Sequence, residues 1–150
     1  MIQRKQTLFL FVALVLTLLC LCMPVGYITP QGMGTDMIIY NLGVRGIDIA
    51  GYTGWPLMIL LLVACSLCAV TIFLYHNRRL QMRLCVWMEV LYAAWYIYLL
   101  WPVFHVFGMI GSFRANWTAC LPFISIVLCM MAHHAIKKDE DLVRSADRIR

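Results

Sequence analysis

Apolar residues fill four long stretches of this chain, separated by shorter polar segments. Residues 7–23, 56–75, 84–107 and 117–136 contain a single charged residue among them. Each stretch has roughly the 17 to 25 residues that a helix needs to cross a bilayer. Because lipid cannot satisfy backbone polar groups, a span is a helix or a barrel strand, and apolar runs this long without alternation are not barrel strands. The pattern predicts an all-α fold, a four-transmembrane-helix bundle.

The segment between the first two stretches, residues 24–55, is the one polar piece with room for a structure of its own. It holds two short β-prone runs, "MIIYNL" and "IDIAGY", separated by "GVRG". A connector of this length with glycine suits a hairpin. A glycine-rich loop without fixed structure would have the same composition. We therefore expect a single integral membrane domain over residues 1–150, with a small β-hairpin in this loop.

The composition supports the bilayer as the main partner of the chain. It is 63% hydrophobic and 13% charged, whereas soluble domains are about a quarter charged. The net charge of +5 would suit nucleic acid if the basic residues formed one patch. They lie instead at the ends of the apolar stretches, so nucleic acid is not expected as a partner.

The basic residues predict the orientation. Ten of the twelve fall before the first stretch, between the second and third, or in the tail at residues 137–150, and only Arg45 and Arg114 fall in the other two loops. The positive-inside rule then places both termini in the cytoplasm, N-in and C-in. Arg4 and Lys5 before an apolar run also fit a signal peptide. No small-x-small cleavage site follows, so an uncleaved anchor is expected.

The seven cysteines lie within or at the edge of apolar runs. Free cysteine packs as a small hydrophobe, so reduced thiols are expected. Cys65 and Cys68 form a C-x-x-C, but near the middle of a span, where a thiol oxidase could not meet a soluble partner. The four histidines lack the spacing of metal ligands. We recognise no catalytic residue, no metal site and no cofactor-binding motif.

The third apolar stretch carries Glu89, the only charge within any of the four. At 100° per residue, one face of this helix is predicted to meet lipid and the opposite face the bundle interior. The lipid face holds Trp87, Leu91, Tyr98, Trp101 and, at its edge, Trp95; the interior face holds Cys85, Glu89, Tyr92, Ala93 and Tyr96.

An ionisable residue inside a membrane calls for a partner. The fourth stretch runs antiparallel to the third, which brings His133 and His134 near the depth of Glu89. Our hypothesis is a hydrogen-bonded contact between Glu89 and His133 or His134, helped by Tyr92, that fixes the packing of these two helices. A carboxylate that snorkels to the headgroups explains Glu89 equally well, and the sequence does not give its charge state.

The tail "KKDEDLVRSADRIR" is predicted to be a short cytoplasmic amphipathic helix that continues from the fourth apolar stretch. Leu142, Ala146 and Ile149 share one of its faces. That face suits docking to a partner protein, and the basic residues suit anionic headgroups. A solvated helix end remains an alternative.

The opening "MIQRKQTLFL" and the closing "KKDEDLVRSADRIR", flanking four spans, resemble the domain of unknown function 4293 family of small four-helix membrane proteins from Bacteroidetes. The resemblance covers the whole chain. It implies a multi-pass protein of the bacterial inner membrane, and it implies no activity and no site residues.

These observations favour a non-catalytic subunit, scaffold or assembly partner over an enzyme. The alternative is a small carrier or proton-coupled transporter in which Glu89 takes up the proton, acting as an oligomer because four helices enclose little volume. It would need a polar path from Glu89 to the outer surface, and the residues beyond Tyr96 and Tyr98 are mostly apolar.

Overall fold

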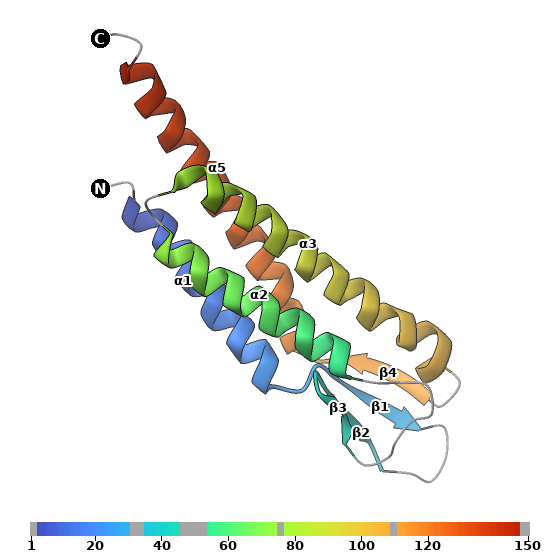
Figure 1. Ribbon diagram of the computed structural model, residues 1–150. Helices are drawn as coiled ribbons and strands as arrows, with labels where there is room; N and C mark the ends of the chain where they lie inside the picture. The colour runs from blue at the N-terminus through green and yellow to red at the C-terminus, as the bar shows by residue number, and fades with distance from the viewer. Residues whose placement is uncertain (1–2, 31–34, 46–53, 75–76, 109–110, 148–150) are drawn as a thin grey trace.

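The structure is a computed structural model that describes residues 3–30, 35–45, 54–74, 77–108 and 111–147. Within these residues the chain is mostly helical. The four α-helices are α1 (Gln3–Cys22), α2 (Trp55–Phe73), α3 (Arg78–Pro102) and α5 (Leu121–Asp147). They pack side by side, with α1 against α5 and α2, and α3 against α2 and α5 (Figure 1). The first residues of α1 and the last of α5 lie at one end of the bundle, and a small sheet lies at the other.

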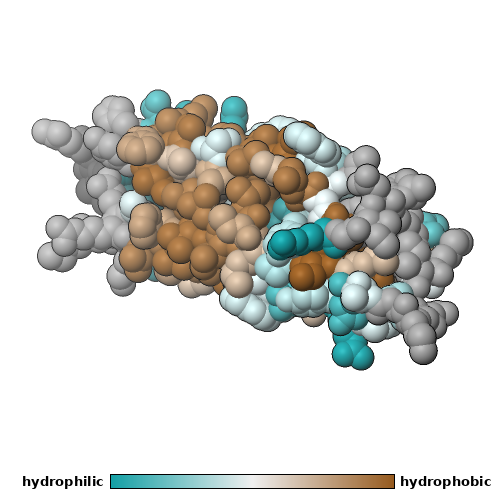
Figure 2. Space-filling model, turned by 90° about the horizontal axis from the view of Figure 1, so that it is seen from below, coloured by the Kyte–Doolittle hydropathy of each residue, from teal (hydrophilic) through white to brown (hydrophobic). Residues whose placement is uncertain are grey.

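Three segments of the described chain are long and apolar enough to cross a membrane: Trp55–Phe73, Arg78–His105 and Trp117–Glu140. The apolar part of α1, Gln6–Cys22, is shorter. Figure 2 shows a continuous apolar surface over the middle of the molecule and more hydrophilic residues toward the sheet. Apolar residues thus cover the outside of the bundle as well as its core, which is typical of helices that meet lipid.

Each helix contributes to the core one stripe of buried residues, which are spaced three or four positions apart. Its fully buried members include Leu10 and Ala13 of α1, Leu61 and Cys68 of α2, Met88 and Tyr92 of α3, and Cys129 and Ala132 of α5. Because this spacing keeps side chains on one face of a helix, each helix turns a single stripe inward.

A four-stranded antiparallel sheet in the order β3-β2-β1-β4 covers one end of the bundle. Its strands are β1 (Gly26–Pro30), β2 (Met37–Tyr40), β3 (Gly43–Arg45) and β4 (Gly111–Ala115). The first three lie between α1 and α2, and β4 comes from the connection between α3 and α5. Both loops at this end of the bundle therefore contribute to one sheet.

The expected hairpin is present as β2 and β3, but its second strand differs from the prediction. The connector "GVRG" provides that strand, pairing Val44 with Ile39 and Gly43 with Tyr40. The expected strand at residues 47–52 lies outside the described residues. The partner strands β1 and β4 were not predicted. Gly111 of β4 faces Thr29 so closely that a Cβ there would overlap the Thr29 carbonyl, which explains a glycine at this position.

The ends of α3 and α5 differ from the apolar stretches that predicted them. α3 begins at Arg78, six residues before the predicted start, because the mostly polar residues that precede the apolar run also form about a turn and a half of helix. Pro102 ends its regular part, and a π-helical turn, η1 (Val103–Phe107), leads toward β4. A 3-10 turn, η2 (Trp117–Cys120), precedes α5. α5 then runs unbroken into the tail, so the predicted tail helix is a continuation of the fourth apolar helix.

Candidate functional site

Asn41, in the turn between β2 and β3, joins the sheet to the bundle. Its side chain is 1% exposed. The Nδ2 group donates to the carbonyl of Cys20 at 2.6 Å, and Oδ1 accepts from Nε1 of Trp95 at 3.1 Å. One side chain thus binds the last turn of α1 and the middle of α3. Such bonds are strongest where water is excluded, so this contact holds the sheet in a defined position.

Trp95 is fully buried, and its predicted place at the edge of the lipid face is wrong. The prediction used only the angle of each residue around the helix axis. The sequence gives no sign that a loop residue accepts a hydrogen bond from the indole of Trp95. Trp87 and Trp101, in contrast, are 62% and 58% exposed, as the face assignment requires. On the interior face Cys85 and Tyr92 are buried, whereas Ala93 is exposed.

Tyr92 makes its hydrogen bond to α1. Its hydroxyl lies 2.7 Å from Oγ1 of Thr17, which donates to the carbonyl of Ala13 at 2.7 Å. Both side chains are fully buried. A hydroxyl pair inside an apolar bundle is a strong link between two helices, because neither group has water as an alternative partner.

Two further contacts lie at the end of the bundle that carries the sheet, which we call its outer end. The hydroxyl of Tyr96 donates to the carbonyl of Ala119 at 2.6 Å and accepts from the backbone N–H of Phe123 at 3.0 Å, which ties α3 to the start of α5. The carbonyl of Pro24 accepts from Asn116 at 3.1 Å and also from Thr118. We call the side chains of Thr17, Asn41, Tyr92, Trp95, Tyr96, Asn116 and Thr118 the outer network.

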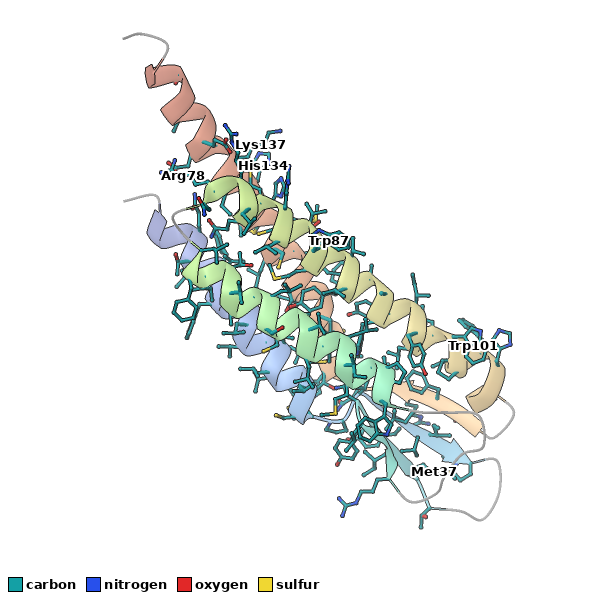
Figure 3. The ribbon with its side chains drawn as sticks, in the orientation of Figure 1. Met37, Arg78, Trp87, Trp101, His134 and Lys137 are labelled. Carbon is teal, nitrogen blue, oxygen red and sulfur yellow. The ribbon has the colours of Figure 1, made fainter. Side chains whose placement is uncertain are left out.

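The opposite end of the bundle, which we call the tail end, is held by ion pairs. Nη1 of Arg78 lies 3.0 Å from Asp139, and Nε of Arg79 lies 3.4 Å from Glu140. The Arg79 side chain is 90% exposed. These pairs join the first turn of α3 to α5 where α5 leaves the bundle. Figure 3 shows Arg78, His134 and Lys137 near this end, and Met37 and Trp101 near the other.

Buried amides lie behind these ion pairs. Gln81 of α3 is 4% exposed and donates to the carbonyl of Thr71 over a long 3.4 Å. Gln6 of α1 is 6% exposed, and its Nε2 group is buried without a hydrogen-bond partner in the described part of the chain. The polar groups at this end are therefore less completely paired than those of the outer network.

Glu89 lies on α3 and His133 on α5, which packs against it, and both side chains are half-buried. No hydrogen bond or ion pair joins them among the contacts of the described residues. The Tyr92 hydroxyl is bound to Thr17, and His134 is exposed on the outside of α5.

All seven cysteines are free thiols. Cys20, Cys68, Cys85 and Cys129 are buried, Cys65 is half-buried, and Cys22 and Cys120 are exposed. Sγ of Cys68 lies 3.2 Å from the carbonyl of Leu10, as expected of a weak thiol donor in a core. No cluster of three or more potential metal ligands occurs within the residues that the structure describes.

The tail extends beyond the rest of the bundle as part of α5 (Figure 1). Leu142, the first residue of the predicted docking face, is 51% exposed. The side chains of Ala146 and Ile149 lie outside the described residues, so the remainder of that face stays a prediction.

Sequence reasoning missed the outer network because its members are joined by the fold. Asn41 follows a short strand in a loop, and nothing in that loop shows that its side chain enters the bundle. Thr17 did carry a signal, since a hydroxyl within a long apolar run is an intramembrane polar group that needs a partner. Its partner could have been sought among the tyrosines of residues 84–107.

Comparison with known proteins identifies the family. No curated protein matches the chain. A family model described as Domain of unknown function (DUF4293) matches residues 2–149, nearly the full length. The chain therefore belongs to the DUF4293 family.

Proposed function

We propose that this protein is a four-span, multi-pass protein of the bacterial inner membrane with both termini in the cytoplasm, and that it serves as a non-catalytic subunit or assembly partner. In this proposal a cytoplasmic protein docks on the α5 tail, and the bundle with its outer sheet is the membrane anchor of the assembly.

Aromatic and basic residues at opposite ends of the bundle support this orientation. Trp55, Trp101 and Trp117 stand at the helix ends next to the sheet and are 64%, 58% and 61% exposed. Tryptophan is enriched at membrane interfaces, and lysine and arginine at the cytoplasmic side. The basic ends of α3 and α5 lie at the other end, with Arg78, Arg79, Lys137 and Lys138.

The length of α1 supports a fourth span. Its apolar part is shorter than those of the other helices, but α1 as a whole has 20 residues. At about 1.5 Å per residue it covers about 30 Å, the thickness of the hydrocarbon core. It also packs against α5 and α2.

The observation that carries the docking proposal is the unbroken course of α5 past the ion pairs. Arg78 and Arg79 of α3 bind Asp139 and Glu140 of α5. Beyond them the helix continues along the bundle axis to Asp147 with Leu142 exposed (Figure 1). A helix that stands away from the bilayer in this way suits a protein partner better than a membrane surface, on which an amphipathic helix lies flat.

Reporter fusions test the topology. A reporter that is active only in the cytoplasm should work after Arg150, and one that is active only outside should work in the loop near Gly34. An external reporter that is active after Arg150 would contradict the proposal, because ten basic residues would then face the wrong side.

Photo-crosslinking in living cells tests the docking. A photoreactive residue at Leu142 should give a discrete protein adduct, and one at the exposed Lys137, on a different face of the same helix, should give little. The Leu142→Asp variant should insert normally and lose its partner. Equal adducts from both positions, or a partner that still binds Leu142→Asp, would contradict docking through this face.

The alternative, a proton-coupled carrier, is favoured by one observation: no hydrogen bond or ion pair engages Glu89 within the residues that the structure describes. It requires a polar path from Glu89 to the outer surface. Along α3 in that direction the hydroxyl of Tyr92 and the indole N–H of Trp95 are both held by buried partners. Packed side chains with satisfied polar groups fit an anchor better than a pathway.

A further inference from the structure

The ion pair between Arg79 and Glu140 lies on the surface of the seam between α3 and α5. The Arg79 side chain is 90% exposed, so the pair does not lie between the two helices. Arg83 follows Arg79 by four residues, and Lys137 precedes Glu140 by three. Side chains at these spacings share a face of their helix. Arg83 and Lys137 therefore lie on the same side of the seam as the ion pair, one turn nearer the middle of the bundle.

Arg83 and Lys137 also lie at similar heights along the bundle. The two helices are antiparallel, and Arg78 binds Asp139 across the seam. Arg83 comes five residues after Arg78, and Lys137 comes two residues before Asp139, a difference in height of about 4.5 Å. Helical side chains lean toward the N-terminus of their own helix, which tilts these two toward each other. Two long basic side chains can thus reach one ligand at the seam.

These two cations have no partner within the residues that the structure describes. The acidic side chains of the neighbouring turn, Asp139 and Glu140, already bind other arginines. No hydrogen bond or ion pair in the described part of the chain engages Arg83 or Lys137, and both side chains are exposed. The seam therefore presents two unpaired positive charges on adjacent helices, an arrangement that attracts an anion.

An apolar strip continues from these charges toward the sheet. Arg83 is the last basic residue before the apolar run of α3, and Lys137 is the first after that of α5. Basic residues at such a boundary meet the headgroups of a bilayer. Val86 and Val90 follow Arg83 by three and seven residues, Met130 precedes Lys137 by seven, and all three side chains are exposed. The surface combines a positively charged end with an apolar length, which matches the two parts of a lipid.

We propose that this seam binds one anionic phospholipid. The lipid phosphate lies between Arg83 and Lys137, and an acyl chain runs along Val86, Val90 and Met130 toward the sheet. The guanidinium group can bind two phosphate oxygens at once, and the ammonium group provides a point charge. The site rests on the proposed position of α3 and α5 across the bilayer. It is independent of the docking of a partner protein to the tail.

Native mass spectrometry of the full-length protein tests the preference for an anionic lipid. The protein is released from nanodiscs that contain equal parts of phosphatidylglycerol and phosphatidylcholine, which both carry a phosphate but differ in net charge. We expect the parent to retain phosphatidylglycerol preferentially. Arg83→Gln and Lys137→Gln should each weaken this retention about fivefold, and Lys137→Arg should keep it.

Lys138→Gln is the matched control. Lys138 is also exposed, but as the next residue of α5 it lies on a different face from Lys137. This variant should retain phosphatidylglycerol as the parent does. Equal losses in Arg83→Gln, Lys137→Gln and Lys138→Gln would overturn the proposal, because they would indicate a general effect of surface charge. Equal retention of the two lipids by the parent would also overturn it.

Inorganic phosphate distinguishes a lipid headgroup from a free phosphate ion. Added phosphate should displace the retained lipid no more than chloride at the same ionic strength, because burial of the acyl chain contributes to lipid binding. Displacement by phosphate but not by chloride would show that the site takes the free ion, and would overturn the assignment to a lipid.

A measurement on the parent protein avoids any effect of a substitution on folding. NMR signals of isotope-labelled methionine methyl groups are recorded in nanodiscs with lipids that carry a spin label on an acyl chain. Labelled phosphatidylglycerol should broaden the Met130 signal at a lower fraction than labelled phosphatidylcholine. Met131, which is also exposed but on another face of α5, should respond equally to both. An equal response of Met130 to the two lipids would overturn the lipid site alone. No broadening at either methionine would contradict the membrane position of α5 as well.

Discussion

The two ends of the bundle use similar polar residues but differ in how completely they are paired. At the outer end Asn41, Tyr92 and Trp95 are buried and each has a short or well-placed partner. At the tail end Gln6 has an unpaired Nε2, Gln81 makes a long bond, and Glu89 has no bonded partner in the described chain. The buried polar groups of the outer end are satisfied, whereas those of the tail end are incompletely paired within the described residues.

The difference follows from what each end has to hold. The outer end positions a sheet made of two loops that are distant in the sequence, and loops gain a defined position only through specific bonds. The tail end joins α2 to α3 through a short connection and needs little more than ion pairs. Local stability is expected to follow the same gradient, with the outer network opening last.

Loss of Asn41 should have the largest effect. Asn41→Ala leaves the indole N–H of Trp95 and the carbonyl of Cys20 buried without partners, each at about 1 to 3 kcal/mol. We expect the free energy of unfolding in detergent to fall by about 2 to 4 kcal/mol. Asn77→Ala is the control, since Asn77 is exposed and its side chain does not cap α3. If Asn41→Ala and Asn77→Ala were equally stable, the outer end of the bundle would not be held by the Asn41 side chain, and the contrast between the two ends would be wrong.

Removal of the indole N–H donor of Trp95 should lower the free energy of unfolding by less than the loss of Asn41 does. Trp95→Phe keeps an aromatic ring in the core but removes Nε1–H, so that Oδ1 of Asn41 loses its bond. We expect a loss of about 1 to 2 kcal/mol. Trp87→Phe, on the exposed face of the same helix, should change the unfolding free energy by less than about 0.5 kcal/mol. A larger loss for Trp87→Phe would indicate that the faces of α3 are assigned wrongly.

At the tail end a substitution of a buried polar residue should stabilise the protein. Gln6→Leu removes the unpaired Nε2 donor and keeps a side chain of similar size, so the unfolding free energy should rise by about 1 kcal/mol. Gln81→Leu, which removes a bond to Thr71, should not raise it. Destabilisation by Gln6→Leu would mean that the amide is paired in the membrane.

The ion pairs should contribute least to the free energy of unfolding. Arg79 is exposed, and a pair of this kind is worth about 0 to 1 kcal/mol and weakens with salt. Arg79→Gln should lower the unfolding free energy by less than about 0.5 kcal/mol, whereas Arg78→Gln should lower it somewhat more, since Asp139 is only 14% exposed. High salt should abolish the difference between Arg79→Gln and the parent.

Prediction from sequence succeeded where one helix or one apolar run decides the outcome. The helices, the continuation of α5 into the tail and the position of β2 follow from local pattern and length. The sheet was predicted only as a hairpin, because its other strands come from separate loops and pair through a register that no local pattern reveals. Trp95 was misplaced for the same reason, since its burial depends on Asn41. The contact of Glu89 with His133 or His134 stays a prediction, since helix direction and depth can be counted along the chain but the position of each side chain cannot.

A double-mutant cycle on Asn41 and Trp95 tests most directly the claim that the outer network fixes the sheet to the bundle. The unfolding free energies of the parent, Asn41→Ala, Trp95→Phe and the double variant give the coupling between the two residues. If the bond holds as described, the double variant should be more stable than the sum of the two losses implies, by about 1 kcal/mol or more. Strict additivity would show that Asn41 and Trp95 act independently, and would contradict the account.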